Sequence, residues 1–397
     1  MQHLKIFYKI LVMLCMLFSV AACNIDEPAP APEPIPQPNP GEVVERTVLV
    51  YIVARNSLGA WDFDLDDIQE MLQAAKSGAF GKNRLILFHS RYGEAPSLKE
   101  VTAGGVKQLK SYDMEFSAIE ARNMTKVIAD VKAAAPASNY GIVLWSHADG
   151  WLQSGIPDTG IQKRAFGDDN HRSMNVTTLA RVLDGEDFDF VYFDCCFMGG
   201  VEVAYQLRGV TPRIVASPSE LPSPGMPYDK TLPYLMADEA DVEGAARATF
   251  AYYDALAGSS RTCTMSVIDT SHLADLAGKV RALYRLHPAL NDIDAIQQYA
   301  GSRSSFHGYY FDLGHYMSNL DAGNEGCGLA YAEAVDALDR CLIYRAATPY
   351  LWQYDREEVK IDHYSGLSTY VLQNPPVSSD KGYEELEWYK DVAKALF

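Results

Sequence analysis

The chain has 397 residues, 48% of them hydrophobic, and its formal net charge at pH 7 is −18. No basic stripe runs along it, which excludes a nucleic-acid partner attracted through its phosphates. We attribute the acidity to solubility, and the roughly 350 residues beyond position 43 are enough for a large core.

The N-terminus resembles a lipoprotein signal peptide. Two lysines precede an apolar run over residues 10–20, which is about half the length of a membrane-spanning helix. Two alanines then lead into Cys23, where we expect cleavage of the signal and lipidation of the cysteine. An ordinary secretory signal is the alternative.

Acidic residues and prolines follow Cys23. Asp26 and Glu27 resemble the surface-export signal of Bacteroidetes lipoproteins, and residues 28–40 alternate Pro with Ala, Glu and Asn. This composition favours an extended tether of about 3 Å per residue. We therefore expect a signal peptide over 1–22 and a lipidated tether over 23–43. The protein would be exposed at the cell surface and attached to the outer membrane through Cys23 only.

Strand-like and helix-like segments alternate from residue 44 to about residue 240. Continuous apolar runs rich in β-branched residues predict buried strands, and helices between them predict a mainly parallel sheet covered on both faces. Active sites of such folds lie at the carboxyl ends of the strands. The expected strands are 48–53, 84–88, 106–112, 140–145, 190–193 and 213–216, and the expected helices are 66–75 and 125–135.

The pattern becomes mainly helical after about residue 240. We therefore divide the globular part into a core over 44–240 and a helical C-terminal part over 241–397 that completes the sheet. The expected fold class is α/β, a three-layer αβα sandwich with a mixed, mainly parallel central sheet. The expected helices are 242–257, 275–286 and 329–346, and the expected short strands are 265–268 and 368–372.

Five cysteines follow the lipidation site, and an odd number in an exported protein predicts at least one free thiol. There is no CxxC pair, which argues against a zinc site built on thiolates. Adjacent cysteines are poorly placed to bond to each other, so one of Cys195 and Cys196 is the candidate reactive thiol. The pairing among Cys263, Cys327 and Cys341 is left open.

Two expected strands end in residues that can carry chemistry. One runs through Ser146 into His147, and the other runs through Asp194 into Cys196. An imidazole beside a thiol promotes thiolate formation at neutral pH. Either residue alone would more often be structural, because a buried cysteine is usually inert. Because both residues stand at strand ends, a catalytic role is as well supported as a structural one.

Residues 145–151 read Trp-Ser-His-Ala-Asp-Gly-Trp, and residues 194–199 read Asp-Cys-Cys-Phe-Met-Gly. Both stretches resemble the catalytic segments of the clostripain family of cysteine peptidases. The likeness continues through 201–205 and recurs at Ala216, Ser217, Gly225, Tyr228 and 366–368, so it touches most of the globular part.

The resemblance implies a caspase-like fold and a cysteine endopeptidase that cleaves peptides or proteins. Cys196 would be the nucleophile and His147 the general base. Backbone N–H groups of Cys196 and Ala148 would stabilise the oxyanion. Cys195 stands where the family usually has Ala, so its side chain should point into the core.

The resemblance also implies how the substrate is held. Asp194 would line the pocket for the P1 side chain, and a buried carboxylate suits Arg or Lys. Relatives specific for basic residues carry Pro-Gly-Asp-Gly-Trp-x-Tyr in a later loop, where this chain has Pro224 in place of the Asp. Glu220 and Asp229 are nearby acids that could substitute, so basic specificity is left open.

Members of the family are often cut between the His and the Cys. Lys163 and Arg164 lie at the matching place, and a solvated basic pair on a loop is the alternative.

Two functions therefore remain open. The first is the cysteine endopeptidase, and the second is a catalytically weakened surface lipoprotein that acts as a binding module. Ala148 and Pro224 favour the second. Relatives have Gly in place of Ala148, and if the loop needs a positive φ there, Ala costs about 1 kcal/mol or more. We expect a monomer with no organic cofactor and no metal site. Calcium could bind the acids 62, 64, 66 and 67, but an acidic helix start accounts for them better.

Overall fold

The structure is a computed structural model that describes residues 41–153, 165–286, 288–290, 292–321, 327–353, 357–372 and 382–396. All of these fall within one compact unit. The expected signal peptide and tether up to residue 40, with Cys23, and the pair Lys163 and Arg164 lie outside the described residues. No helix of the described segments is long and apolar enough to cross a membrane.

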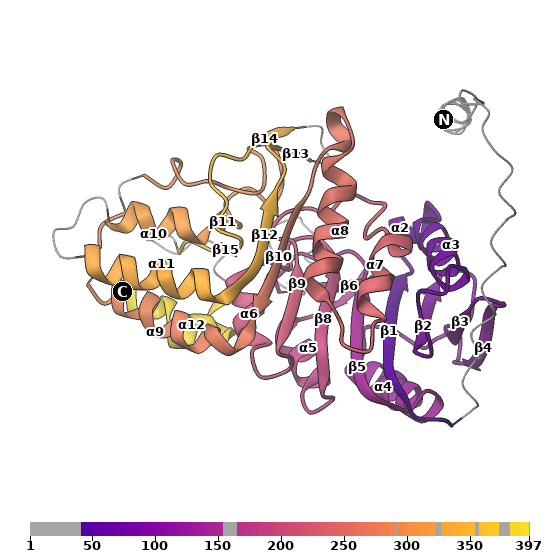
Figure 1. Cartoon of the computed structure of the whole chain (residues 1–397). Helices are drawn as coiled ribbons and strands as arrows, with labels where there is room; N and C mark the ends of the chain where they lie inside the picture. Colours follow the sequence, from indigo (N-terminus) through magenta and orange to yellow (C-terminus); the bar gives the residue numbers. More distant parts are fainter. Residues whose placement is uncertain are drawn as a thin grey trace, which may run out of the picture. The chain divides into compact units, whose positions relative to one another are not determined.

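The described segments contain a nine-stranded mixed sheet in the order β12-β10-β9-β8-β5-β1-β2-β3-β4 (Figure 1). Its central strands are parallel: β9 (Arg213–Ala216), β8 (Phe188–Asp194), β5 (Ala137–Trp145), β1 (Val44–Ala54) and β2 (Arg84–Arg91). Antiparallel strands flank them: β3 (Ser97–Thr102) and β4 (Gly105–Ser111) at one edge, β10 (Thr264–Asp269) and β12 (Leu342–Ala347) at the other.

The central strand β1 shows why its apolar run is continuous. Val48, Val50 and Ile52 face one buried cluster. Leu49 and Tyr51 face a second cluster on the opposite side of the sheet. A strand covered on both faces needs apolar residues at every position, which is typical of the buried centre of a parallel sheet.

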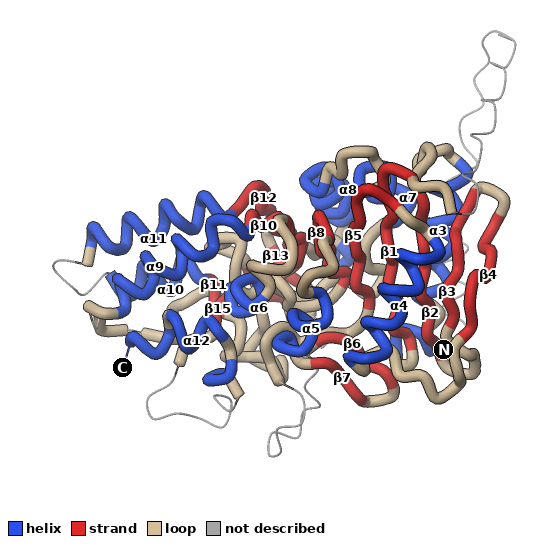
Figure 2. The backbone as a smooth tube through the Cα atoms, turned by 90° about the horizontal axis from the view of Figure 1, so that it is seen from below, coloured by secondary structure: helices blue, strands red, loops and turns tan. Residues whose placement is uncertain are grey.

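Helices cover both faces of the sheet, as Figure 2 shows. The packing faces of these helices are apolar and belong to the same two clusters as the strands. These three layers confirm the expected αβα sandwich. One face carries α3 (Phe63–Lys76), α7 (Tyr228–Leu235) and α8 (Val242–Asp254), and the other carries α4 (Ala121–Ala134), α5 (Val176–Leu183), α6 (Val201–Gln206) and α9 (Leu273–Tyr284).

Shorter elements complete the described part. Three small antiparallel pairs lie outside the main sheet: β6 (Phe166–Asp169) with β7 (Arg172–Met174), β11 (Phe311–Asp312) with β15 (Ser368–Thr369), and β13 (Tyr350–Trp352) with β14 (Glu358–Lys360). The remaining helices are α2 (Ser57–Ala60), α10 (Leu313–Asp321), α11 (Gly328–Cys341) and α12 (Glu387–Asp391).

Several expectations about elements were wrong. The strand expected over 368–372 covers only Ser368–Thr369. The helix expected over 329–346 ends at Cys341, and the chain enters β12 at the next residue. Neither Gly nor Pro marks this boundary, and it is pairing with β10 that draws the segment into the sheet. Strand β3 was missed because its sequence Ser-Leu-Lys-Glu-Val-Thr, in which buried and half-buried residues mix, carries no continuous apolar run.

Candidate active site

His147 and Cys196 leave the sheet from neighbouring parallel strands at the same level. Trp145, the last residue of β5, pairs in register with Asp194, the last residue of β8. His147 and Cys196 each follow two residues later. Since adjacent strands lie about 4.8 Å apart, the fold places both residues just beyond the carboxyl ends of neighbouring strands.

The His147 loop is tied to the loop that follows β1. Ser146 Oγ donates to the carbonyl oxygen of Val53 at 2.8 Å. It also accepts from Asn56 Nδ2 at 3.2 Å. One residue further along both loops, Ser57 Oγ lies 2.8 Å from His147 Nε2. Two consecutive side-chain contacts therefore fix where the imidazole sits.

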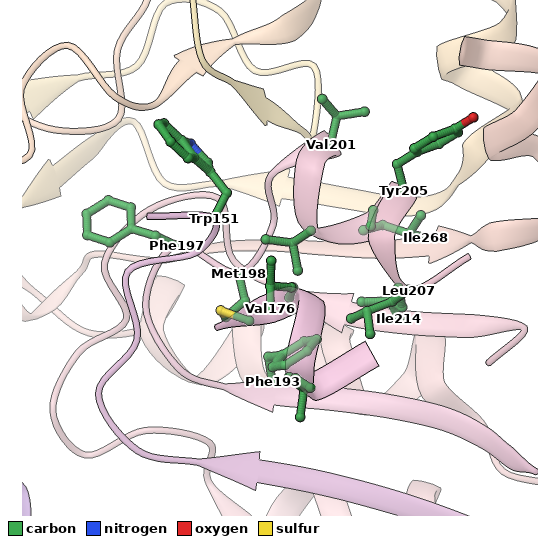
Figure 3. Close-up of a cluster of buried hydrophobic side chains, with 14 of the residues drawn as sticks. Trp151, Val176, Phe193, Phe197, Met198, Val201, Tyr205, Leu207, Ile214 and Ile268 are labelled. Carbon is green, nitrogen blue, oxygen red and sulfur yellow. The ribbon is translucent and has the colours of Figure 1, made fainter. Parts of the chain in front are cut away.

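The Cys196 loop bends sharply at Phe197. This residue has φ +60, which is uncommon for residues other than Gly and costs roughly 1–2 kcal/mol. Its N–H donates to the carbonyl oxygen of Ser219 at 2.9 Å. Its ring stacks on Tyr310 at 4.1 Å between centroids. Phe193, Phe197 and Met198 share one buried cluster, so packing stabilises the bend after Cys196 (Figure 3).

The two loops contact each other directly. Gly150 has φ +59, and a Cβ there would lie 2.5 Å from the carbonyl oxygen of Phe197. Tyr310, which stacks on Phe197, donates its hydroxyl to the carbonyl oxygen of Asp149 at 2.8 Å. Ala148, expected at the oxyanion position, lies between His147 and Asp149 in the sequence and is buried.

The Cys196 thiol lies against Leu221. Its sulfur accepts from the Leu221 N–H at 3.4 Å. Burial raises the pKa of this thiol above its ordinary value, and the negative charge of Glu220 is the next largest cause. Asp149 and Asp194 act in the same direction. The electrostatic potential around the Cys196 sulfur is therefore negative.

Cys195 points the other way, as expected. Its thiol donates to the carbonyl oxygen of Leu144 at 3.0 Å. The side chain belongs to the hydrophobic core, and burial raises its pKa above the ordinary value. An inert, core-facing sulfur therefore stands directly beside the candidate nucleophile.

Glu220 is held near Cys196 by an anchored loop. Ser217 Oγ and Ser219 Oγ are buried and each lies 2.7 Å from Thr264 Oγ1 of β10. This anchor fixes the backbone immediately before Glu220, which is half-buried. Pro224, further along the same loop, is exposed.

Asp194 binds the next part of that loop, residues 225–228, through hydrogen bonds. Its carboxylate accepts from the Met226 N–H at 2.9 Å and from the Tyr228 hydroxyl at 3.0 Å. A Cβ on Gly225 would come within 2.9 Å of the same oxygens. Burial raises the pKa of Asp194 to about 7, and the charge of Glu70 on α3 adds to the effect.

The family model described as the clostripain family matches residues 50–393. The chain belongs to the clostripain family. It is a cysteine peptidase, as the solved structures that resemble it also indicate.

Three solved members illustrate the likeness. An inactive zymogen of a C11 protease from Parabacteroides distasonis has 28% identity and a TM-score of 0.76, over 88% of this chain and 99% of that one. The secreted C11 cysteine protease iotapain from Bacteroides thetaiotaomicron has 25% identity and a TM-score of 0.76, over 90% and 100%. A secreted C11 cysteine protease of that organism, bound to an irreversible peptide inhibitor, has 30% identity and a TM-score of 0.74, over 88% and 99%. Comparison with curated proteins gives no match.

The described part of this clostripain-family peptidase contains neither a disulfide nor a group of side chains suited to a metal ion. All five cysteines from position 195 onward are free thiols. Among the residues with described positions, no group of three or more His, Cys, Asp or Glu side chains is arranged to hold a metal ion. Two of the acids near α3 turn inward, where Asp64 bonds the His89 ring and Asp67 accepts from the Trp145 ring.

Sequence reasoning missed Asn56 and Ser57. They lie 90 residues before the residues that they contact, and no spacing rule connects the two loops. The available signal was an Asn-Ser pair directly after a buried strand, since such residues often cap a helix or bond to a neighbouring loop.

Proposed function

We propose that this peptidase hydrolyses peptide bonds with a dyad of Cys196 and His147 and acts as an endopeptidase. The observation that carries the proposal is their equal offset from the register pair Trp145 and Asp194. Equal offset on adjacent parallel strands gives a thiol and an imidazole a common edge of the sheet.

The proposed reaction has two stages. His147 takes the thiol proton as the Cys196 sulfur forms a bond to the peptide carbonyl carbon. Backbone N–H groups of Cys196 and Ala148 stabilise the oxyanion. The carbon–nitrogen bond then breaks, and the amine leaves with the proton from His147. Water next attacks the thioester, gives its proton to His147 and releases the acid and Cys196.

We propose that the P1 side chain is cationic. Glu220 raises the pKa of the Cys196 thiol, so a bound Arg or Lys beside Glu220 would offset that charge and favour the thiolate. Asp194 would form the floor of the pocket beneath Gly225. One of its oxygens accepts from Met226 and the other from Tyr228, and each has a second lone pair for a cation. Pro224 carries no charge, so Glu220 is the acid of this loop whose charge acts on the thiol.

A peptide library that varies the P1 residue tests both parts of this proposal. The purified protein should cleave after Arg and Lys, and Cys196→Ala should cleave nothing. Cleavage after other residues, lost in Cys196→Ala, would keep the dyad and reject the cationic pocket. No cleavage by either protein would favour a binding lipoprotein with weakened catalysis.

We propose that the peptidase is activated by cleavage after Arg164. The support is the position of the basic pair between His147 and Cys196, together with a related C11 protease that is described as an inactive zymogen. Intact mass spectrometry should show two fragments for the wild type and one chain for Cys196→Ala. Two fragments in Cys196→Ala, free of added protease, would reject self-cleavage.

We also propose that Cys23 carries a lipid that anchors the protein to the outer membrane, with the peptidase exposed at the cell surface. The support is the apolar run over 10–20 that ends at two alanines and Cys23. Cys23→Ser should move the protein out of the membrane fraction, and an unchanged distribution would reject the anchor. We propose that the protein acts as a monomer and without a cofactor.

A further inference from the structure

We propose that Ser57 is a positioning residue for His147, whose ring it holds through Nε2 and whose protonated form it stabilises. The proposal rests on the proposed dyad, because it assigns a role to a neighbour of the general base. Ser57 Oγ lies 2.8 Å from His147 Nε2.

The contact is built on a rigid support. Asn56 is buried, and its side-chain oxygen accepts from the N–H groups of Leu58 and Gly59 at 2.9 and 3.3 Å, so it caps α2. Its amide donates to Ser146 Oγ, and it also reaches the carbonyl oxygen of Asp168 at 2.9 Å. The residue before Ser57 is therefore bonded both to the residue before His147 and to β6.

Helix α2 approaches the end of the strand before it so closely that no side chain fits at Gly59. A Cβ on Gly59 would lie 2.0 Å from the carbonyl oxygen of Ala54, the last residue of β1. The helix therefore packs backbone against backbone on the end of the strand. Ser57, its first residue, is held by this contact as well as by the cap.

The chemistry of imidazole gives the contact its meaning. A neutral His has one N–H and one lone pair, and a serine hydroxyl can either donate to the ring or accept from it, so the contact fits either neutral tautomer. After His147 takes the thiol proton, both ring nitrogens are donors and Nε2–H donates to Ser57 Oγ. This hydrogen bond stabilises the imidazolium formed after transfer. Ser57 thereby orients the ring and favours the protonated state through which the dyad passes.

Two measurements on Ser57→Ala, Ser57→Thr and Ser77→Ala test this role. The first is kcat and KM for a peptide substrate. The second is the rate at which iodoacetamide alkylates Cys196, mapped by mass spectrometry. Thr keeps the hydroxyl. Ser77 is a matched control, since its hydroxyl also makes a 2.8 Å bond, to the carbonyl oxygen of Ala74 at the end of α3.

Ser57→Ala should lower kcat about 10-fold with KM unchanged, a smaller loss than the 10²–10⁴-fold expected for a general base itself. Alkylation of Cys196 should slow in parallel. Ser57→Thr should restore most of both rates, and Ser77→Ala should match the wild type. Unchanged or faster rates in Ser57→Ala would overturn the proposal. The alkylation rate reports on Ser57 even if the wild type cleaves no peptide, so failure of the dyad as a peptidase would be recognised separately.

Discussion

Gly150 and Phe197 join the two loops of the site through their backbones, because the place of a Cβ on Gly150 lies 2.5 Å from the Phe197 carbonyl oxygen. Gly150 comes three residues after His147, and Phe197 comes directly after Cys196. Both have φ near +60. The relative placement of His147 and Cys196 therefore depends on two left-handed positions in contact, of which only Phe197 is strained.

Substitution of Gly150 should disturb the site more than strain alone would. Gly150→Ala adds the cost of a positive φ, about 1–2 kcal/mol, and also displaces the Phe197 carbonyl. We expect kcat/KM to fall at least 10-fold, measured on a peptide substrate. Gly93→Ala is the matched control, because Gly93 has φ +78 and nothing within 4 Å of its Cβ position. Equal losses in the two variants would mean that the contact with Phe197 is unimportant.

Glu220→Gln should change both the reactivity of Cys196 and the P1 preference. Removal of the charge lowers the pKa of the Cys196 thiol, since Glu220 raises it. Alkylation of Cys196 at neutral pH should therefore become faster. Preference for Arg and Lys at P1 should weaken, by about 1 kcal/mol or more for a charged contact. Asp229→Asn, which removes another acid of the same region, should change neither quantity.

The P1 profile and the alkylation rate together decide the role of Glu220. Faster alkylation with an unchanged P1 preference would leave Glu220 as an electrostatic neighbour of the thiol and move the specificity to another group.

The buried carboxyl of Glu202 should make the protein less stable as pH rises. Glu202 lies in α6, and burial raises its pKa to about 7 despite hydrogen bonds from Thr369, Tyr370 and Tyr383. A raised folded-state pKa gives stability that is fully present below the unfolded value, about 4.5, and is lost as pH rises through about 7. The folded state then carries a buried charge.

Glu202→Gln should remove this pH dependence, because it keeps the acceptor oxygen without the charge. Urea unfolding at pH 5 and pH 8 would measure it. The stability of Glu202→Gln relative to the wild type should rise between these pH values by up to about 3 kcal/mol. Exposed Glu384→Gln is the control. A difference that stays constant with pH would show that Glu202 does not titrate in this range.

The sequence predicted the centre of the sheet better than its edges. Strands such as β1 are covered on both faces, so their continuous apolar runs are visible in the sequence. Strand β12 has a half-exposed pattern and follows α11 with no stop signal at Leu342. Its state is decided by pairing with β10, about 75 residues earlier, and local propensity contains no information about that partner.

The site divides in the same way. His147 and Cys196 could be predicted because each directly follows a recognisable strand, and the family resemblance joined them. The contact of Ser57 with His147, and the approach of Gly150 to Phe197, depend on how loops from distant segments pack. No periodicity or spacing in the sequence encodes such contacts.

Cys196, and not its neighbour Cys195, is the proposed nucleophile. Peptide cleavage by the wild type, Cys196→Ala and Cys195→Ala tests this assignment most directly, because the two cysteines are adjacent but only the Cys195 sulfur bonds into the core at Leu144. We predict full loss of cleavage in Cys196→Ala and nearly wild-type cleavage in Cys195→Ala. Cleavage that survives in Cys196→Ala, or that is lost in a folded Cys195→Ala, would contradict the account.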